Sequence, residues 1–130
     1  MIKKTLGLRH VALFVNNLEA CVTFYTKLLG MEIEWQPDPD NVYLTSGNDN
    51  LALHRAPKDF EPNNSQRLDH IGFIIETMNE VDEWHEHFVK NNVVIKMKPK
   101  THRDGARSFY CEDPAGNHVQ LIFHPPISIA

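Results

Sequence analysis

Histidine is the residue type in this sequence best suited to chemistry near neutral pH, and two of its eight histidines recur at matching places. His10 lies in the run LRHVALFV, and His70 lies in the similar run LDHIGFII, at an offset of 60. Neutral imidazole nitrogens bind divalent transition metals and also transfer protons. A single strand histidine is more often a core or surface residue than a ligand. The repetition of a histidine at matching positions of two similar runs favours a metal or active-site role for His10 and His70.

The elements that must position these histidines also repeat. Each run predicts a strand, and each strand is followed by a helical pattern. The first helix is expected over 18–29, with Gly30 as its C-cap. The second is expected to begin at a capping box formed by Thr77 and Glu80 and to end at Asn91. Three strands are expected after each helix, at 31–36, 42–46 and 51–55, and at 93–98, 107–112 and 118–123. We therefore predict one domain over 1–130, built from two βαβββ modules (8–56 and 68–124) joined by a polar linker (57–67).

The alternation of strand side chains predicts a shared face. His10 lies on one face with Ala12, and His70 on one face with Gly72, so a very small residue accompanies each imidazole and indicates a cavity. On the closing strands Ala52 and Gln120 are equivalent. His54 shares the face of Ala52, and His124 shares the face of Gln120. The remaining histidines are expected to be surface or helix-packing residues: His85, His87, His102 and His118.

Composition excludes several classes of function. A formal net charge of −4 disfavours a nucleic-acid-binding protein. No apolar run approaches the roughly 20 residues that span a bilayer, so no membrane partner is expected. The basic start is interrupted by Arg9 and His10, which disfavours a secretory signal. Cys21 and Cys111 are distant and fit reduced thiols, so we expect a cytoplasmic protein.

The sequence resembles the vicinal oxygen chelate superfamily, which includes glyoxalase I, fosfomycin-modifying thiol transferases, methylmalonyl-CoA epimerase, extradiol dioxygenases and bleomycin-resistance proteins. Four segments carry the resemblance, at 8–33, 43–57, 68–75 and 107–126. The resemblance implies an α+β, glyoxalase-like fold in which paired βαβββ modules form a curved mixed sheet around a central cavity. It also implies metal ligands on the first and last strands of each module.

Carried over to this sequence, the resemblance makes His10 and His70 ligands of a divalent metal (Zn, Ni, Mn or Fe), with Gln120 where the family usually has Glu. Ala52 occupies the remaining ligand position and cannot bind metal. With Gln120, neither the carboxylate base of a glyoxalase nor the two-His, one-carboxylate face of an extradiol dioxygenase is present in its usual form. His54 is the predicted catalytic residue, and either metal-bound water or His54 is expected to move protons.

Ser108, Tyr110 and His124 are the predicted substrate-binding residues. The stretch around Ser108 and Tyr110 resembles the strand of fosfomycin thiol transferases whose hydroxyls contact the phosphonate. The alternative is an ordinary strand with alternating polar residues. The basic segment 96–107 favours a solvated loop over a clamp for an anionic substrate or for glutathione carboxylates; its cations are Lys96, Lys98, Lys100, Arg103 and Arg107.

Three functions follow as hypotheses. The first is a glyoxalase-like lyase or isomerase that acts on a small polar metabolite through Lewis-acid polarisation of vicinal oxygens. The second is a thiol transferase with glutathione as co-substrate. The third is a metal-free small-molecule-binding protein of the bleomycin-resistance kind, favoured by Ala52 and Gln120. A homodimer is expected, and the sequence leaves open whether the modules pair within a chain or between subunits.

Overall fold

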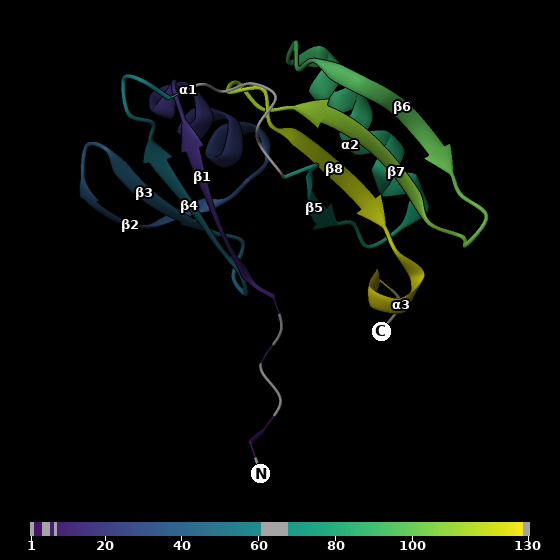
Figure 1. The fold of residues 1–130 in the computed structure, drawn as a ribbon. Helices are drawn as coiled ribbons and strands as arrows, with labels where there is room; N and C mark the ends of the chain where they lie inside the picture. The colour runs from purple at the N-terminus through teal and green to yellow at the C-terminus, as the bar shows by residue number, and fades with distance from the viewer. Residues whose placement is uncertain (1, 4–5, 7, 61–67, 129–130) are drawn as a thin grey trace. The chain divides into compact units, whose positions relative to one another are not determined.

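The computed structural model describes residues 2–3, 6, 8–60 and 68–128. They belong to two compact units, 1–62 and 63–130, each of which carries one four-stranded mixed sheet with helices (Figure 1). The strand orders are β1-β4-β3-β2 and β5-β8-β7-β6. This repetition confirms the α+β class and the two βαβββ modules. Of the predicted linker, residues 61–67 lie outside the described residues.

Unit 1 contains β1 (His10–Val15), α1 (Leu18–Thr23), the π-helical turn η1 (Phe24–Leu28), β2 (Glu32–Asp38), β3 (Asn41–Thr45) and β4 (Asn50–Arg55). The predicted helix therefore has the expected extent, but its second half is wound more loosely than an α-helix. Gly30 follows with φ +86°, the left-handed conformation that glycine adopts without steric cost. β1 runs parallel to β4, and the other pairs are antiparallel.

Unit 2 contains β5 (Ile71–Ile74), α2 (Met78–Lys90), β6 (Ile95–Thr101), β7 (Arg107–Glu112), β8 (His118–Phe123) and α3 (Pro125–Ser128). The Thr77 hydroxyl accepts a hydrogen bond from the Glu80 backbone amide (3.2 Å), which confirms the predicted N-cap. The predicted strand 68–75 is shorter, so His70 precedes β5. After β8, Pro125 and Pro126 begin a helical turn, because proline fits the first turn of a helix.

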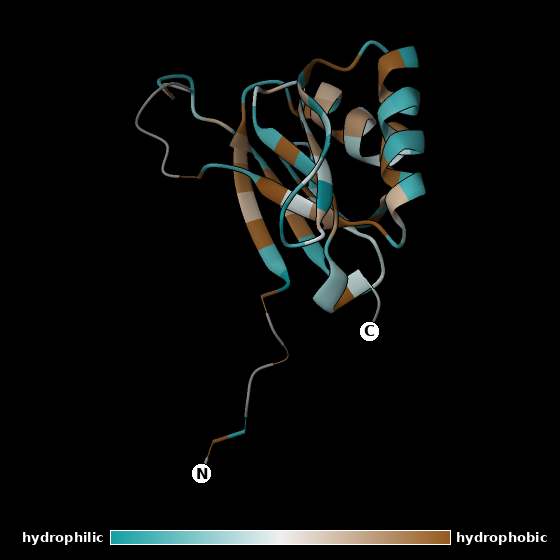
Figure 2. Ribbon diagram, turned by 90° about the vertical axis from the view of Figure 1, so that its right-hand side faces the viewer, coloured by the Kyte–Doolittle hydropathy of each residue, from teal (hydrophilic) through white to brown (hydrophobic). Residues whose placement is uncertain are grey.

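One face of each sheet packs on its helix. In β1, Leu13 and Val15 are buried while His10, Ala12 and Phe14 are exposed, as the alternation predicts. In unit 2 the Phe109 ring on β7 lies 5.9 Å from the Phe88 ring on α2, and both are fully buried. Figure 2 shows the same division, with hydrophobic residues of the long helix toward the sheet and hydrophilic ones away from it. The opposite face of each sheet is therefore the one that can carry a site.

The strand registers of the two units are equivalent. Ala52 pairs with Tyr43 in unit 1, and Gln120 pairs with Tyr110 in unit 2. Two residues further along β4 and β8, His54 pairs with Asn41, and Ile122 pairs with Ser108. The register confirms that Ala52 and Gln120 occupy matching positions. Among the described residues, no helix is long and apolar enough to cross a membrane.

Candidate functional site

His10 is an exposed residue at the start of β1, and its ring is held by a neighbour on β4. Its Nδ1 lies 2.8 Å from the Asn50 amide oxygen, and the Asn50 amide nitrogen donates to Glu34 (3.0 Å). An amide oxygen only accepts, so Nδ1 carries the proton in this contact and the Nε2 lone pair remains available. The sequence analysis missed Asn50 and Glu34, although Asn50 pairs with His10 in the parallel register.

His70 in unit 2 also has an oxygen beside its Nδ1, but the partner is its chain neighbour rather than a residue of the paired strand. Its Nδ1 lies 2.6 Å from a carboxylate oxygen of Asp69, and its ring meets the Tyr110 ring edge-on at 5.1 Å. The carboxylate accepts, so Nε2 is again the unprotonated nitrogen of the neutral ring. Gln120 pairs with Gly72, and a Cβ on Gly72 would lie 3.6 Å from the Gln120 Oε1 atom. A Cβ at position 72 would therefore make an ordinary van der Waals contact with the Gln120 amide.

These donor atoms fit a divalent metal by their chemistry. Metal-binding histidines usually donate their second ring nitrogen to a carbonyl or carboxylate oxygen, which fixes the tautomer and the ring orientation. His10 and His70 both do so, toward Asn50 and Asp69. Gln120 adds a neutral oxygen. Within the described residues no group of three or more His, Cys, Asp or Glu side chains is placed to hold a metal ion.

His54 lies elsewhere on the sheet of unit 1. Its Nδ1 is 2.6 Å from the Asn41 amide oxygen, and its ring packs against Tyr43 (5.9 Å) and Phe14 (6.1 Å). His54 pairs with Phe14, and His10 pairs with Asn50 four positions earlier on the same two strands. Four positions correspond to roughly 13 Å along a strand. The structure does not bring His54 and His10 together, and the catalytic role of His54 stays a prediction.

Around His54, the open face of unit 1 is aromatic. Trp35 stacks on Tyr43 with ring centroids 5.2 Å apart, and Phe14 contacts Phe60 at 5.9 Å. Trp35 is 59% exposed and Phe14 is 55% exposed. This face therefore presents exposed ring surface together with the imidazoles of His10 and His54.

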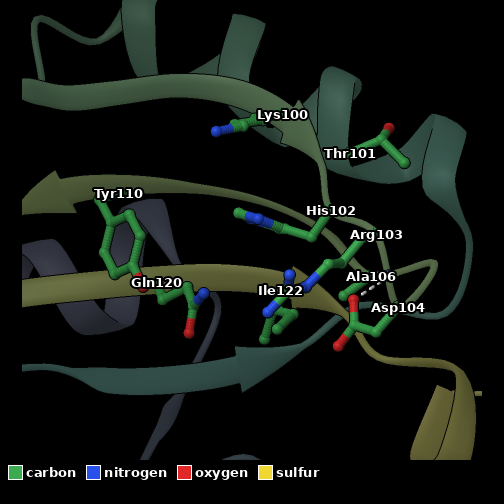
Figure 3. A pocket seen from close by; sticks show the side chains of 9 residues that line it. All are labelled: Lys100, Thr101, His102, Arg103, Asp104, Ala106, Tyr110, Gln120 and Ile122. Carbon is green, nitrogen blue, oxygen red and sulfur yellow. Dashed lines mark hydrogen bonds between the residues drawn. The ribbon is translucent and has the colours of Figure 1, made fainter.

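Unit 2 has a pocket of about 590 Å³ on the corresponding face (Figure 3). It is formed by the end of β6, the following loop, β7 and β8, and it brings Tyr110 and Gln120 together. Nine residues line it: Lys100, Thr101, His102, Arg103, Asp104, Ala106, Tyr110, Gln120 and Ile122.

His102 was expected from the sequence to be a surface or helix-packing residue, but it lies at the pocket. It is half-buried, it lines the pocket, and its Nε2 lies 3.3 Å from the Ser108 hydroxyl. Ser108 itself is fully buried and does not line the pocket, and its hydroxyl contacts the pocket residue His102. The sequence does not predict this contact. The six-residue spacing between His102 and Ser108 brings the two side chains together only when the loop between them folds back. His124 lies at the start of α3, where its backbone amide donates to Ser128 (2.9 Å).

The basic segment is divided by the fold. Lys96 pairs with Glu112 (3.2 Å), and Arg107 makes two hydrogen bonds to Asp82 (2.7 and 3.2 Å). Lys100 and Arg103 instead line the pocket, and neither has an ion pair with another described residue. Two of the five cations, Lys96 and Arg107, are therefore held by carboxylates. Lys100 and Arg103 line the pocket and remain exposed, as does Lys98.

Burial alters two protonation equilibria near the pocket. Burial, with a smaller contribution from Asp69, raises the pKa of the Tyr110 phenol, which extends to higher pH the range in which the hydroxyl is protonated and can donate. Burial also raises the pKa of the Cys111 thiol to about 12. Cys21 is buried as well. A buried thiol of raised pKa is a poor nucleophile and a poor metal ligand, because the thiolate is the reactive form.

The sequence and the fold match a known class of proteins. Residues 7–121 match the model of the Glyoxalase/Bleomycin resistance protein/Dioxygenase superfamily, so the chain belongs to that superfamily. This result confirms the vicinal oxygen chelate resemblance.

Three similar proteins illustrate the range of this superfamily. A lactoylglutathione lyase from Agrobacterium tumefaciens has a TM-score of 0.78 at 22% identity, over 96% of this chain and 98% of that one. An integron cassette protein from the mobile metagenome of a Halifax Harbour sewage outfall has a TM-score of 0.76 at 27% identity, over 92% and 100%. A trivalent organoarsenical cleaving enzyme from Bacillus sp. (strain MD1) is 26% identical over 90% of this chain and 79% of its own length.

Proposed function

We propose that this protein is a metal-dependent lyase or isomerase that acts on a small polar metabolite, with a divalent metal held by His10, His70 and Gln120. One observation carries the proposal: two histidines at equivalent places in the repeat each donate an Nδ1 proton to a neighbouring oxygen and keep Nε2 available. Membership of a superfamily that includes a lactoylglutathione lyase supports an enzymatic role.

The chain's own residues supply orientation and proton transfer. When bound, a divalent metal supplies Lewis-acid polarisation of two neighbouring substrate oxygens. Gln120 offers an amide oxygen, which does not accept a proton near neutral pH, so proton transfer requires another side chain. His54 is the residue predicted from the sequence. His102 is a second imidazole, and it lines the same pocket as Gln120.

Elemental analysis of tag-free protein purified without chelators tests the proposal. We expect stoichiometric Zn, Ni, Mn or Fe in the wild type and its loss in the His10→Ala/His70→Ala double variant. The matched control is His85→Ala/His87→Ala, which removes two histidines from α2 and should leave the metal content unchanged. A wild-type protein that stays metal-free after reconstitution would refute the proposal and favour a metal-free binding protein.

A thiol transferase is the second candidate, because Tyr110, Lys100 and Arg103 line one pocket and could hold an anionic substrate or the carboxylates of glutathione. The direct assay is glutathione- and metal-dependent consumption of fosfomycin. No consumption with added Mn or Zn would exclude this class.

Organoarsenical cleavage is not favoured by this chain's thiols. Trivalent arsenic, a soft centre, binds best to thiolates. The chain has two cysteines, Cys21 and Cys111, and both are buried. They lie in different units, and the raised pKa of Cys111 keeps its thiol protonated. These two cysteines therefore do not offer an accessible pair of thiolates.

We also propose that the protein works as a homodimer in the cytoplasm. Large apolar side chains on the open sheet faces support self-association, including Phe14 (55% exposed), Trp35 (59%) and Ile74 (46%). Light scattering should give about twice the chain mass of 15.0 kDa. A monomer at micromolar concentration would refute the dimer.

A further inference from the structure

We propose that two carboxylates of β2, Glu34 and Asp38, are positioning residues. Each acts through an asparagine and sets which ring nitrogen of a unit 1 histidine stays unprotonated. The two histidines are His10, the candidate metal ligand, and His54, the predicted catalytic residue. We call each set of carboxylate, asparagine and histidine a relay. This inference rests on the proposed function for the roles of the two histidines, but their tautomers can be measured without it.

The first relay leads from β2 through β4 to β1. The Asn50 amide nitrogen donates to the Glu34 carboxylate (3.0 Å), and the Asn50 amide oxygen lies 2.8 Å from Nδ1 of His10. A carboxylate only accepts hydrogen bonds, so the NH2 group must face Glu34 and the amide oxygen must face the imidazole. That oxygen also only accepts, so His10 carries its proton on Nδ1 and presents the Nε2 lone pair.

The second relay has the same order of groups. The Asn41 amide nitrogen donates to both carboxylate oxygens of Asp38 (2.9 and 3.0 Å), and the Asn41 amide oxygen lies 2.6 Å from Nδ1 of His54. Hydrogen bonds from the Asn41 side chain and the Asp40 backbone lower the pKa of the Asp38 carboxyl, so this acceptor is charged at neutral pH. His54 is half-buried and packs edge-on against Tyr43 (5.9 Å), which limits competition from water.

Irregular pairing of β2 accompanies both relays. The register of β2 against β3 shifts between Ile33 and Trp35, so Glu34 is an extra residue of β2. The register shifts again between Trp35 and Asp38. Such bulges redirect side chains and are common beside functional sites. Each carboxylate therefore lies at or next to a shift, where its side chain can be directed toward an asparagine of another strand.

Unit 2 shows that the fold alone does not produce these relays. Its register shifts at the matching place of β6, and the extra residue there is Lys96, which forms an ion pair with Glu112 (3.2 Å). Ile122 occupies the position that His54 has in unit 1. The relays are therefore a property of the side chains of unit 1.

Long-range proton–nitrogen NMR of the metal-free, full-length protein tests the first relay, because it identifies the protonated nitrogen of each ring. Spectra are recorded at about pH 8.5, where ordinary imidazoles are neutral. In Glu34→Gln the new amide can donate or accept, so the Asn50 amide is free to turn and donate to Nδ1 of His10. We expect the ratio of the Nδ1–H to the Nε2–H form of His10 to fall about fivefold or more, as for the loss of one ordinary hydrogen bond.

The second relay is tested in the same way and is the control for the first. Asp38→Ala removes the acceptor of the Asn41 NH2 group, so the ratio should fall at His54 and stay within twofold of the wild type at His10. Glu34→Gln should do the reverse. Unchanged ratios at both histidines, or equal changes at both in either variant, would overturn the inference.

Two further variants separate orientation of the amide from a general loss of structure. Glu32→Gln removes the same charge from the same strand and should leave both ratios unchanged. Glu34→Gln/Asn50→Asp places a carboxylate directly beside Nδ1 of His10, as Asp69 does for His70. This double variant should recover the wild-type ratio at His10 to within twofold. No recovery would mean that Glu34 acts in another way and would refute its positioning role.

Metal affinity separates this inference from the proposed function. If His10 is a ligand, Glu34→Gln should weaken metal binding about tenfold, measured by competition with a chromophoric chelator, and the double variant should recover it. Tautomers that respond as expected in a protein that binds no metal would refute only the metal-dependent function. A metal-binding protein whose tautomers do not respond would refute only the relays.

Discussion

The two units share one architecture and differ in the chemistry of the sheet face opposite the helix. At equivalent register positions unit 1 has Ala52 and His54, and unit 2 has Gln120 and Ile122. Unit 1 presents exposed rings, including Trp35, and unit 2 presents a pocket lined by cations. Backbone pairing is thus the same in both units while the side chains have diverged, which indicates that the open faces are specialised for different contacts.

The β6–β7 loop accounts for much of this difference. In unit 1, residues 39–40 alone connect β2 to β3. In unit 2, residues 102–106 connect β6 to β7, and this longer loop contains His102 and Arg103. Gly105 has φ +88° and Ala106 is buried, so the loop is folded back onto the unit. A loop of unit 1's length would have no room for these side chains.

The largest expected effect compares two phenylalanines, Phe109, which is buried in unit 2, and Phe14, which is exposed in unit 1. Phe109→Ala should lower the free energy of unfolding by about 3–5 kcal/mol, because it leaves a cavity beside Phe88. Phe14→Ala should cost less than about 1 kcal/mol, because the ring is 55% exposed. Urea unfolding of both variants gives the comparison. An equal loss in Phe14→Ala would mean that its ring is covered in solution.

The sequence predicted the fold better than the site. The repeat of His10 at His70 and the strand alternation gave both modules, the helix-facing sides and the equivalence of Ala52 and Gln120. The site depends on contacts that the repeat does not encode. Asn50 contacts His10, which lies 40 residues away along the chain, and His102 contacts Ser108, which lies 6 residues away. Such contacts become visible only when register and loop path are known.

The second prediction concerns the position where unit 1 has Ala52 and unit 2 has Gln120. If Gln120 is a ligand, Gln120→Glu should tighten metal binding by about tenfold or more, because a carboxylate adds a full charge where the amide offers a dipole. Gln120→Met is the matched control, since it keeps a side chain of similar length and removes the oxygen. Its affinity should fall. Competition with a chromophoric chelator measures both, and unchanged affinities would exclude Gln120 from the ligand set.

The smallest expected effect compares the starts of the two helices. The Thr77 hydroxyl accepts the Glu80 backbone amide (3.2 Å) and donates to the Glu80 carboxylate (2.9 Å), so it caps α2. At the start of α1 the Asn17 side-chain oxygen accepts the Cys21 thiol at 3.5 Å, a weak hydrogen bond. Thr77→Ala should therefore cost about 1 kcal/mol of unfolding free energy, and Asn17→Ala should cost less. Thr77→Ser, which retains the hydroxyl, should recover most of the loss. Thermal unfolding followed by circular dichroism measures all three variants. If Asn17→Ala were the more damaging change, the helix of unit 1 would depend on its N-cap residue as strongly as α2 depends on its capping box.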